Sequence, residues 1–335
     1  METIYYLGID IAKKTFQVAL TTDGLNFYEQ EVENNARAIG QYFQNLRKKF
    51  SFHFPRLTVC LEHTGIYSYQ LLEFLIRQDV KVCMEPALQI KRSQGMARGK
   101  SDQVDARRIA QYAVKNHAEL TLWKPLRPTL QKLKALMSVR DRLIKTKVQL
   151  EVPLNEGGEF IEVSIQKSII KSCQHTLMAL RKDISKVEAE IDTLVKEDSL
   201  LKQQARLATS VPGVGKITAL NVILSTGEFE RITEVKQFAC YAGVAPFEHT
   251  SGSSVRGKTR VSKMANMNLK KLLHMAAMSA IQCNEELKHY YERKVGEGKN
   301  KMSVLNAVRN KLISRIFACV KNQRLYQKEF HHMLV

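Results

Sequence analysis

The chain lacks the features that would place it in a membrane or outside a cell. No stretch of its 335 residues approaches the roughly 18–20 uninterrupted apolar residues that span a bilayer. The segment from Met1 to Tyr6 has neither the basic region nor the long apolar core of a secretory signal. We therefore expect a cytoplasmic protein with no membrane partner.

Cysteine is sparse, and its spacing excludes two further classes of protein. The six cysteines stand singly, without the paired spacing of a zinc site or the density of a disulfide scaffold: Cys60, Cys83, Cys173, Cys240, Cys283 and Cys319. We expect reduced and mostly buried thiols.

Acidic residues are few relative to basic ones. The chain has 33 Asp and Glu against 52 Lys and Arg, a net charge of +19 and a pI near 9.6. Its hydrophobic content of 44% is that of a folding chain, and its length allows two domains with ordinary cores. Such a positive excess favours a polyanionic partner, usually nucleic acid, although a basic surface in contact only with water is the alternative.

Residues 1 to about 120 alternate between strand and helix patterns. Apolar alternation predicts strands over 4–11, 15–22 and 25–32, followed by a helix over 36–50. The following patterns predict a strand, a helix, a strand and a helix, over residues 57–62, 67–78, 80–84 and 101–115. This order is typical of an α/β domain of the ribonuclease-H-like, or RuvC-like, class.

Four carboxylates fall at the positions where that layout would gather them. Asp10 and Glu62 end two apolar runs, whereas Asp102 and Asp105 open the helix over 101–115 and share one of its faces. Acids at the ends of buried strands repel one another unless divalent cations neutralise them, and such cations serve phosphoryl transfer. Taken singly, each could be a surface residue. Together they predict a metal site for Mg²⁺ or Mn²⁺.

Residues 126–205 change to a long helical pattern. A first helix leads from Leu126 towards Val148, and Pro153 and Gly157 are expected to break it. A second helix carries apolar residues at alternating spacings of three and four, which form a heptad seam: Leu177, Leu180, Ile184, Val187, Ile191 and Leu194. The two helices could pair with each other as an antiparallel hairpin, or with another subunit as a coiled-coil dimerisation arm.

Residues 206–335 are predicted to be mostly helical and to begin with a helix-hairpin-helix element. Glycines Gly213 and Gly215 would let backbone N–H groups approach a DNA phosphate, and Lys216 follows at the start of the next helix. The spacing is not that of a Walker loop. An ordinary turn between two helices is the alternative.

A serine- and glycine-rich loop follows, flanked by basic residues. Arg256, Lys258, Arg260 and Lys263 could hold a phosphate against a nucleophile, but no convincing base follows nearby. The alternative is a flexible surface loop that binds phosphate without chemistry. A helix over 266–282 comes next.

These motifs, taken in order, resemble one known family. They are Gly8-Ile9-Asp10, Glu62-His63-Thr64-Gly65, Gly99-Lys100-Ser101-Asp102-Gln103-Val104-Asp105-Ala106, Val211-Pro212-Gly213-Val214-Gly215 and Ser251-Gly252. The chain is similar over nearly its whole length to the DEDD transposases of the insertion-sequence one-ten family, which are related to the Piv-type DNA invertases. Only the Asp-x-x-Asp-Ala run is specific by itself.

The resemblance implies three parts and a reaction. They are a RuvC-like DEDD domain over 1–125, a coiled-coil connector over 126–205 and a C-terminal transposase domain over 206–335. It also implies a metal-binding tetrad of Asp10, Glu62, Asp102 and Asp105, with Ser251 forming a covalent 5′-phosphoserine link.

The resemblance implies partners as well. They are donor and target DNA, a structured bridge RNA encoded beside the recombinase gene, and further copies of the chain, as a dimer and as a tetramer in the synaptic complex. As in a prokaryotic mobile element, the protein would act at the nucleoid.

Two details set the chain apart or leave a choice open. Ser253 and Ser254 lie close enough to Ser251 to be alternative nucleophiles. Glu85 precedes Pro86 where members of the family often have Asn, and it stays outside the predicted ligand set.

Three functions fit the residues. The first is an RNA-guided DNA recombinase, within which a guide-free invertase is possible. The second is a hydrolytic nuclease or Holliday-junction resolvase that uses the tetrad with water and no covalent step. The third is a non-catalytic nucleic-acid-binding protein with a degenerate nuclease fold.

Overall fold

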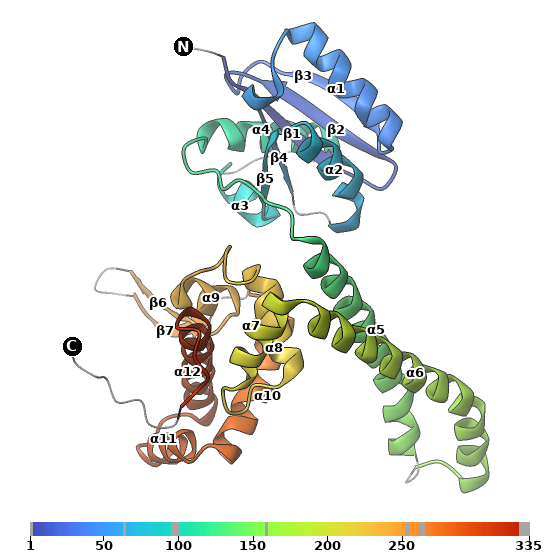
Figure 1. The fold of residues 1–335 in the computed structure, drawn as a ribbon, viewed down its shortest axis with the longest axis vertical. Coiled ribbons are helices and arrows are strands. Elements are labelled where there is room, and N and C mark those ends of the chain that lie inside the picture. Colours follow the sequence, from blue (N-terminus) through green and yellow to red (C-terminus); the bar gives the residue numbers. More distant parts are fainter. Residues whose placement is uncertain are drawn as a thin grey trace. The chain divides into compact units, whose positions relative to one another are not determined.

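A computed structural model describes residues 3–62, 65–94, 101–157, 160–251, 255–261 and 265–327 (Figure 1). The chain divides into two compact units, Met1–Pro125 and Leu126–Val335. A further boundary between residues 205 and 206 stays a prediction.

The first unit is built on a mixed five-stranded sheet in the order β3-β2-β1-β4-β5 (Figure 1). Strands β1, β2 and β3 form an antiparallel meander, and β4 and β5 continue from β1 in parallel. The strands span Tyr5–Ile11, Thr15–Thr21, Tyr28–Glu33, Leu57–Glu62 and Lys81–Glu85. β1 and β4 are buried over most of their length, as expected of central strands covered on both faces.

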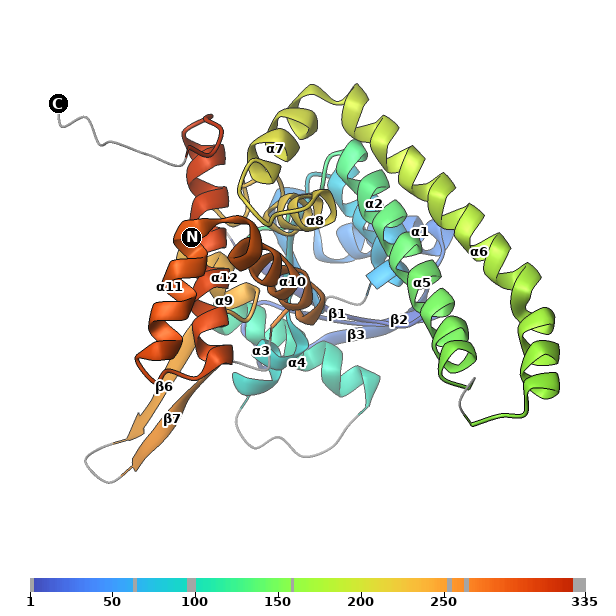
Figure 2. The same cartoon turned by 90° about the horizontal axis from the view of Figure 1, so that it is seen from below.

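Helices cover both faces of this sheet (Figure 2). On one face, α1 (Ala36–Phe50) and α2 (Tyr69–Arg77) bury Phe43, Leu71 and their neighbours against the strands. On the other face lie α3 (Ala87–Arg92) and α4 (Asp102–Lys115). Two short 3₁₀ turns, Phe54–Arg56 and Gly65–Ser68, precede β4 and α2. The strand order and the layers are those of a ribonuclease-H-like, RuvC-like domain, as predicted.

The second unit begins with two long helices that pack along each other. Helix α5 spans Pro128–Glu156 and α6 spans Val163–Glu197. The seam residue Ile191 is buried with Leu133 and Met137 of α5, and the other seam residues are half-buried. Pairing within the chain, one of the two predicted arrangements, is therefore present.

The remainder of the second unit is helical apart from one β-hairpin (Figure 1). Its helices are α7 to α12, which span Ser199–Thr209, Lys216–Thr226, Val235–Tyr241, Met267–Cys283, Glu285–Gly296 and Lys301–Lys321. They enclose a core that includes Phe238, Leu273 and Ile316. The hairpin consists of β6 (Pro246–Ser251) and β7 (Val255–Val261).

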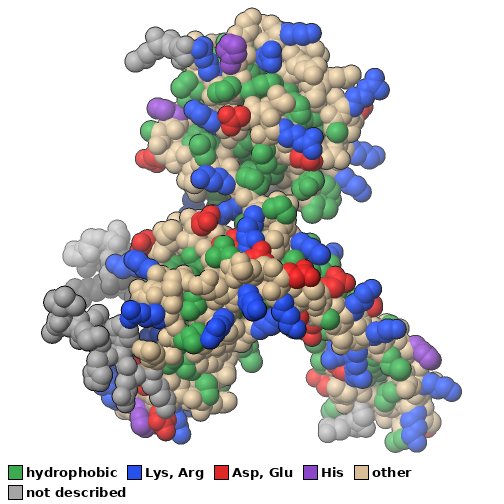
Figure 3. All heavy atoms as spheres, viewed as in Figure 1, with side chains coloured by type: hydrophobic (Ala, Val, Ile, Leu, Met, Phe, Trp, Pro, Cys, Tyr) green, Lys and Arg blue, Asp and Glu red, His purple; other side chains and the backbone are tan. Residues whose placement is uncertain are grey.

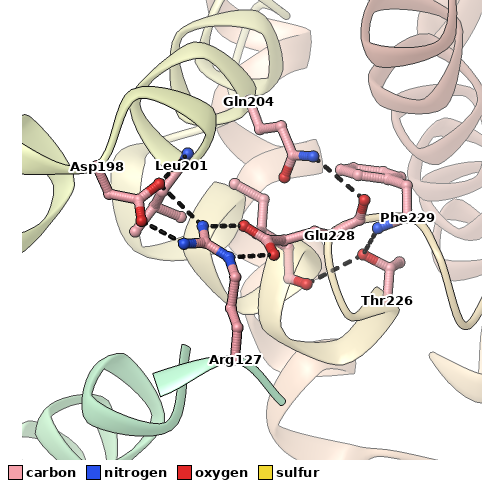
Figure 4. A network of polar contacts seen from close by, with 8 residues as sticks. Arg127, Asp198, Leu201, Gln204, Thr226, Glu228 and Phe229 are labelled. Carbon is pink, nitrogen blue, oxygen red and sulfur yellow. Dashed lines mark hydrogen bonds and ion pairs between the residues drawn. The ribbon is translucent and has the colours of Figure 1, made fainter. Parts of the chain in front are cut away.

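One arginine ties the start of α5 to the rest of the second unit (Figure 4). The Arg127 guanidinium donates to Glu228 through Nε at 2.6 Å and to Asp198 through Nη2 at 2.9 Å, and each carboxylate accepts a second bond from it. Asp198 also caps α7 by accepting from the Leu201 N–H. The hydrogen bonds from Arg127 lower the pKa of Asp198 to about 2. The hydrogen bonds to Glu228 and then to Asp198 raise the pKa of Arg127.

Several expectations were wrong in detail. Pro153 does not break the first long helix, which runs on to Glu156 and has Gly157 as its C-cap. The predicted flexible loop is the hairpin β6–β7, in which Val255 and Val261 favour a strand. Only three cysteines, Cys60, Cys83 and Cys319, are buried, although all six are free thiols.

Among the described residues, no helix is long and apolar enough to cross a bilayer. Lys and Arg side chains are spread over the visible face of each unit, with fewer acidic ones between them (Figure 3). On this face the basic side chains are therefore exposed to solvent, where they can attract a polyanion.

Candidate active site

Asp10 and Glu62 lie on neighbouring strands near one end of the sheet. β1 and β4 are parallel, and Ile9 pairs with Leu61, so that Asp10 and Glu62 follow side by side. Side chains alternate along a strand, and hence both acids share the face on which Gly8 meets α4. Both side chains are half-buried.

Gly8 brings α4 down onto this face. A Cβ built on Gly8 would lie 2.2 Å from the Ala106 carbonyl oxygen and 2.3 Å from the Ala110 nitrogen, so only glycine permits the contact. Ala106 and Ala110 are fully buried there, together with Ala19 of β2. The close approach places the first turn of α4 next to the end of β1, where Asp10 lies.

The first turn of α4 carries the other two predicted acids. Ser101 caps the helix by accepting from the Val104 N–H, and Asp102 and Asp105 follow in the first turn. Negative charges are favoured at this end by the helix dipole. Asp105 accepts a 3.0 Å ion-pair contact from Arg108, whereas the Asp102 side chain is exposed.

The electrostatics of Glu62 indicate that the carboxylates converge. Burial raises the pKa of Glu62, and the charges of Asp10 and then Asp105 raise it further. Asp10 and Asp105 therefore both lie within electrostatic reach of Glu62. Carboxylate oxygens are the ligands that a hard divalent cation prefers, so the donor atoms of these residues suit such an ion. Within the described ranges, however, no three His, Cys, Asp or Glu side chains are already gathered at metal-binding separations.

Glu85 stands in the next strand, on the same face of the sheet as Glu62. It pairs in register with Glu62, is 8% exposed, and has a pKa raised by burial. Burial, and then the charge of Glu85, raise the pKa values of Tyr112 and Cys83, whereas burial and then the charges of Asp10 and Asp105 raise that of Glu62. The carboxyl of Glu85 thus acts on Tyr112 of α4 and on Cys83 of its own strand, and it is not among the charges that affect Glu62.

The predicted nucleophile ends β6. Ser251 pairs with Val255 across the hairpin, and Thr250 pairs with Arg256. Lys258 and Arg260 also lie in β7, whereas Ser253, Ser254 and Lys263 lie outside the described residues. The roles of Ser251 and of the basic residues stay predictions.

The predicted helix-hairpin-helix has two glycines with different surroundings. Gly213 has φ +82°, and a Cβ there would lie 2.5 Å from the Ala276 carbonyl oxygen of α10, so packing accounts for this glycine. Gly215 is the N-cap of α8 and has nothing within 4 Å of its Cβ position. Lys216 forms an ion pair with Asp192 of α6. Contact with DNA at this element stays a prediction.

Two family models match the chain. The model described as "Transposase" of the DEDD class matches residues 7–156, and that of the transposase IS116/IS110/IS902 family matches residues 205–292. The chain belongs to the IS110 family of DEDD transposases. The first match contains all four acids, and the second contains Ser251.

Curated relatives of this transposase match all or part of the chain. A "Pilin gene-inverting protein" of Moraxella bovis is 26% identical over 337 residues, which cover 97% of this chain and 98% of the relative. A "Transposase for insertion sequence element IS1111A" of Coxiella burnetii is 25% identical over 261 residues, 68% of each chain. Among solved structures, RuvC of Thermus thermophilus is 13% identical and covers 34% of this chain and 96% of its own, with a TM-score of 0.27. The strand order β3-β2-β1-β4-β5 by itself identifies the fold of the first unit.

The roles of Gly8 and Arg108 at the site of this transposase were not predicted from the sequence. A glycine inside a buried strand often marks a close backbone approach, and that signal was present at Gly8. Arg108 follows Asp105 by three residues on one helix face, a spacing that predicts an ion pair.

Proposed function

We propose that this transposase cuts and rejoins DNA through a covalent 5′-phosphoserine at Ser251, with a divalent cation held by Asp10, Glu62, Asp102 and Asp105. The observation that supports the proposal is that Asp10 and Glu62 lie side by side at one end of the sheet, with Asp105 near enough for its charge to raise the pKa of Glu62. Membership of the transposase family supplies the reaction class.

The four acids would bind the divalent cation and fix its position. When bound there, Mg²⁺ or Mn²⁺ supplies neutralisation of the phosphate charge and lowers the pKa of an oxygen nucleophile. Arg108 holds Asp105 at 3.0 Å, so this carboxylate is positioned by a neighbour on its own helix. The N-terminus of α4 adds a favourable dipole for any anion at the same place.

The serine step conserves phosphodiester bonds. The Oγ of Ser251 attacks phosphorus, the bond from phosphorus to the 3′-oxygen breaks, and the proton lost by the serine is balanced by one gained at the 3′-hydroxyl. In the reverse direction a 3′-hydroxyl of another strand displaces the serine, so no nucleotide cofactor is required. Arg256, Lys258 and Arg260 of β7 would bind the phosphates beside this serine.

Assembly of several subunits and guidance by an RNA are further parts of the proposed reaction. In the family pattern, the serine of one subunit meets the acids of another in a tetramer, and a bridge RNA pairs with target and donor DNA. Several apolar side chains of α6 outside the seam are exposed, among them Ile165, Ile170 and Met178, which favours association through the long helices. Inversion, as the name of the Moraxella bovis relative states for that protein, would use the same bond exchange on differently arranged sites.

The test is a covalent protein–DNA adduct formed with a nicked or junction substrate in Mg²⁺. We expect Ser251→Ala to abolish it, with Ser253→Ala and Ser254→Ala as matched controls that retain it. Asp102→Asn and chelation of the metal should also abolish it, and RNA that copurifies with the protein should contain one structured species.

Two results would contradict the proposal. An undiminished adduct in Ser251→Ala would exclude this serine. Free 5′-phosphate and 3′-hydroxyl ends without rejoining would select the hydrolytic nuclease instead.

A further inference from the structure

The first unit contains a hollow that the proposed reaction does not use. It has a volume of about 300 Å³ and lies between the C-terminal half of α1, the 3₁₀ turn before β4, and α2. Its lining combines two cations, two aromatic rings and two carboxamides: Arg47, Lys48, Phe54, Phe74, Gln44 and Gln78.

Aromatic rings lie close to cations at this end of α1. The Arg47 guanidinium lies 5.8 Å from the centre of the Phe54 ring, and both side chains line the hollow. The Lys49 ammonium, which is outside the lining, lies 3.9 Å from the centre of the Tyr28 ring. In the part of the chain that the structure describes, neither these two residues nor Lys48 forms an ion pair with a carboxylate. The dipole at the end of α1 favours cations there but does not account for an aromatic hollow between them.

The hollow lies at the opposite end of the sheet from the acids. α1 and α2 end at Phe50 and Arg77, where β4 and β5 begin, whereas Glu62 lies where β4 ends. A strand of six residues spans roughly 20 Å. The hollow also belongs to the α1 and α2 face of the sheet, and the acids to the α4 face. A strand held here is therefore not the phosphodiester being cut.

The side chains that line the hollow match the chemical groups of a nucleotide. Aromatic rings accept the face of an unstacked base, carboxamides bond to its edge, and Arg and Lys bind the flanking phosphates. The volume is at the lower limit of small-molecule sites, which suits one base and excludes a duplex, whose bases are stacked and paired.

We propose that this hollow is a second nucleic-acid site, which takes one base of an unpaired strand between Phe54 and Phe74, with its phosphates on Arg47 and Lys48. The strand can be RNA or an unpaired stretch of DNA, since both present the same base and phosphate. The site does not depend on the serine step, and its failure would leave the proposed recombination chemistry intact.

The test measures binding of the full-length protein to fluorescent oligonucleotides by anisotropy, with a single-stranded RNA, a DNA strand of matching sequence, and a duplex. Gln44→Trp fills the hollow from an exposed position on α1 and leaves every charge in place. We expect it to weaken binding of at least one single strand by about tenfold, the worth of one stacked base, and to leave the duplex unchanged. The strand that is affected identifies the source.

Two charge variants complete the design. Arg47→Ala with Lys48→Ala should weaken the same strand by about tenfold or more, whereas Lys132→Ala with Lys134→Ala removes two exposed charges from α5 as a matched control and should have a smaller effect. Photocrosslinking with a thiouridine-containing strand should label the peptides that carry Phe54 or Phe74. Unchanged single-strand binding in Gln44→Trp, or equal losses in the two charge variants, would overturn the proposal.

Discussion

At the scale of single residues, Gly8 and Glu62 are the informative positions, because neither is typical of a buried strand. Gly8 gives up side-chain packing so that α4 can touch the strand, and Glu62 keeps a carboxyl where burial and two other acids raise its pKa. Each is unfavourable for folding when considered by itself. One explanation accounts for both residues, namely a site at which acids from two strands and a helix come together.

Gly8→Ala tests whether this contact positions the helix. The new methyl group would meet backbone atoms that cannot move aside, so we expect a loss of about 3 kcal/mol in the free energy of unfolding, together with lost DNA cleavage. Urea titration followed by fluorescence of the single tryptophan, Trp123, reports on the first unit, because this side chain packs against its core.

Gly40→Ala is the matched control for that experiment. Gly40 lies in α1 with nothing within 4 Å of its Cβ position, and alanine there should stabilise by about 0.5–1 kcal/mol. Equal stability of Gly8→Ala and wild type would show that α4 does not depend on the contact.

At the scale of elements, the sequence predicts best where a local signal marks the end of an element. Residues 36–50 form a helix with the predicted bounds because Asn35 caps it and Ser51 ends it in the left-handed region. Ser101 marks the start of α4 in the same way. The strand over 57–62 also has its predicted bounds, since its apolar run stops at Glu62.

Other elements could not be predicted because their signals are weak or tertiary. Helix α3 has six residues and no side-chain cap, and it was not predicted. The hairpin β6–β7 contains the glycine- and serine-rich stretch that is typical of loops, and only cross-strand pairing reveals it. The convergence of the acids was predicted from the order of elements, whereas the ion pair of Asp105 with Arg108 was not.

Arg127→Met tests the ion network at the root of α5. Asp198 and Glu228 would lose their shared cation, and we expect about 2 kcal/mol of destabilisation. This is less than the ~3–5 kcal/mol of a fully buried pair, because the Arg127 side chain is 33% exposed. Arg181→Met, which removes a more exposed ion pair with Glu151, is the control and should change the stability much less.

The same network gives a dependence on pH. The pKa of Asp198 is about 2 in the folded protein against its ordinary 3.8, so the folded state binds fewer protons between these values. Its contribution is present above pH 3.8 and is lost as pH falls towards about 2. Urea unfolding followed by far-ultraviolet circular dichroism should show this loss in the wild type and a smaller one in Arg127→Met. Parallel pH profiles would contradict the account.

At the scale of the whole molecule, the chain combines two units with separate cores. The predicted acids lie in the first unit and the predicted serine in the second. The family models match both units, so the whole transposase pattern is present in one chain. A reaction that needs both groups must bring them to one phosphodiester, and we propose that different subunits supply them.

Complementation between two inactive variants tests this claim most directly. Ser251→Ala keeps the acids and Asp102→Asn keeps the serine, and each alone should form no covalent adduct with DNA. Mixed in equal amounts with Mg²⁺ and substrate, they should form the adduct again, attached through Ser251 of the Asp102→Asn chain, as peptide mapping would establish. An adduct that stays absent from the mixture, while a matched mixture with the wild type retains it, would contradict the account.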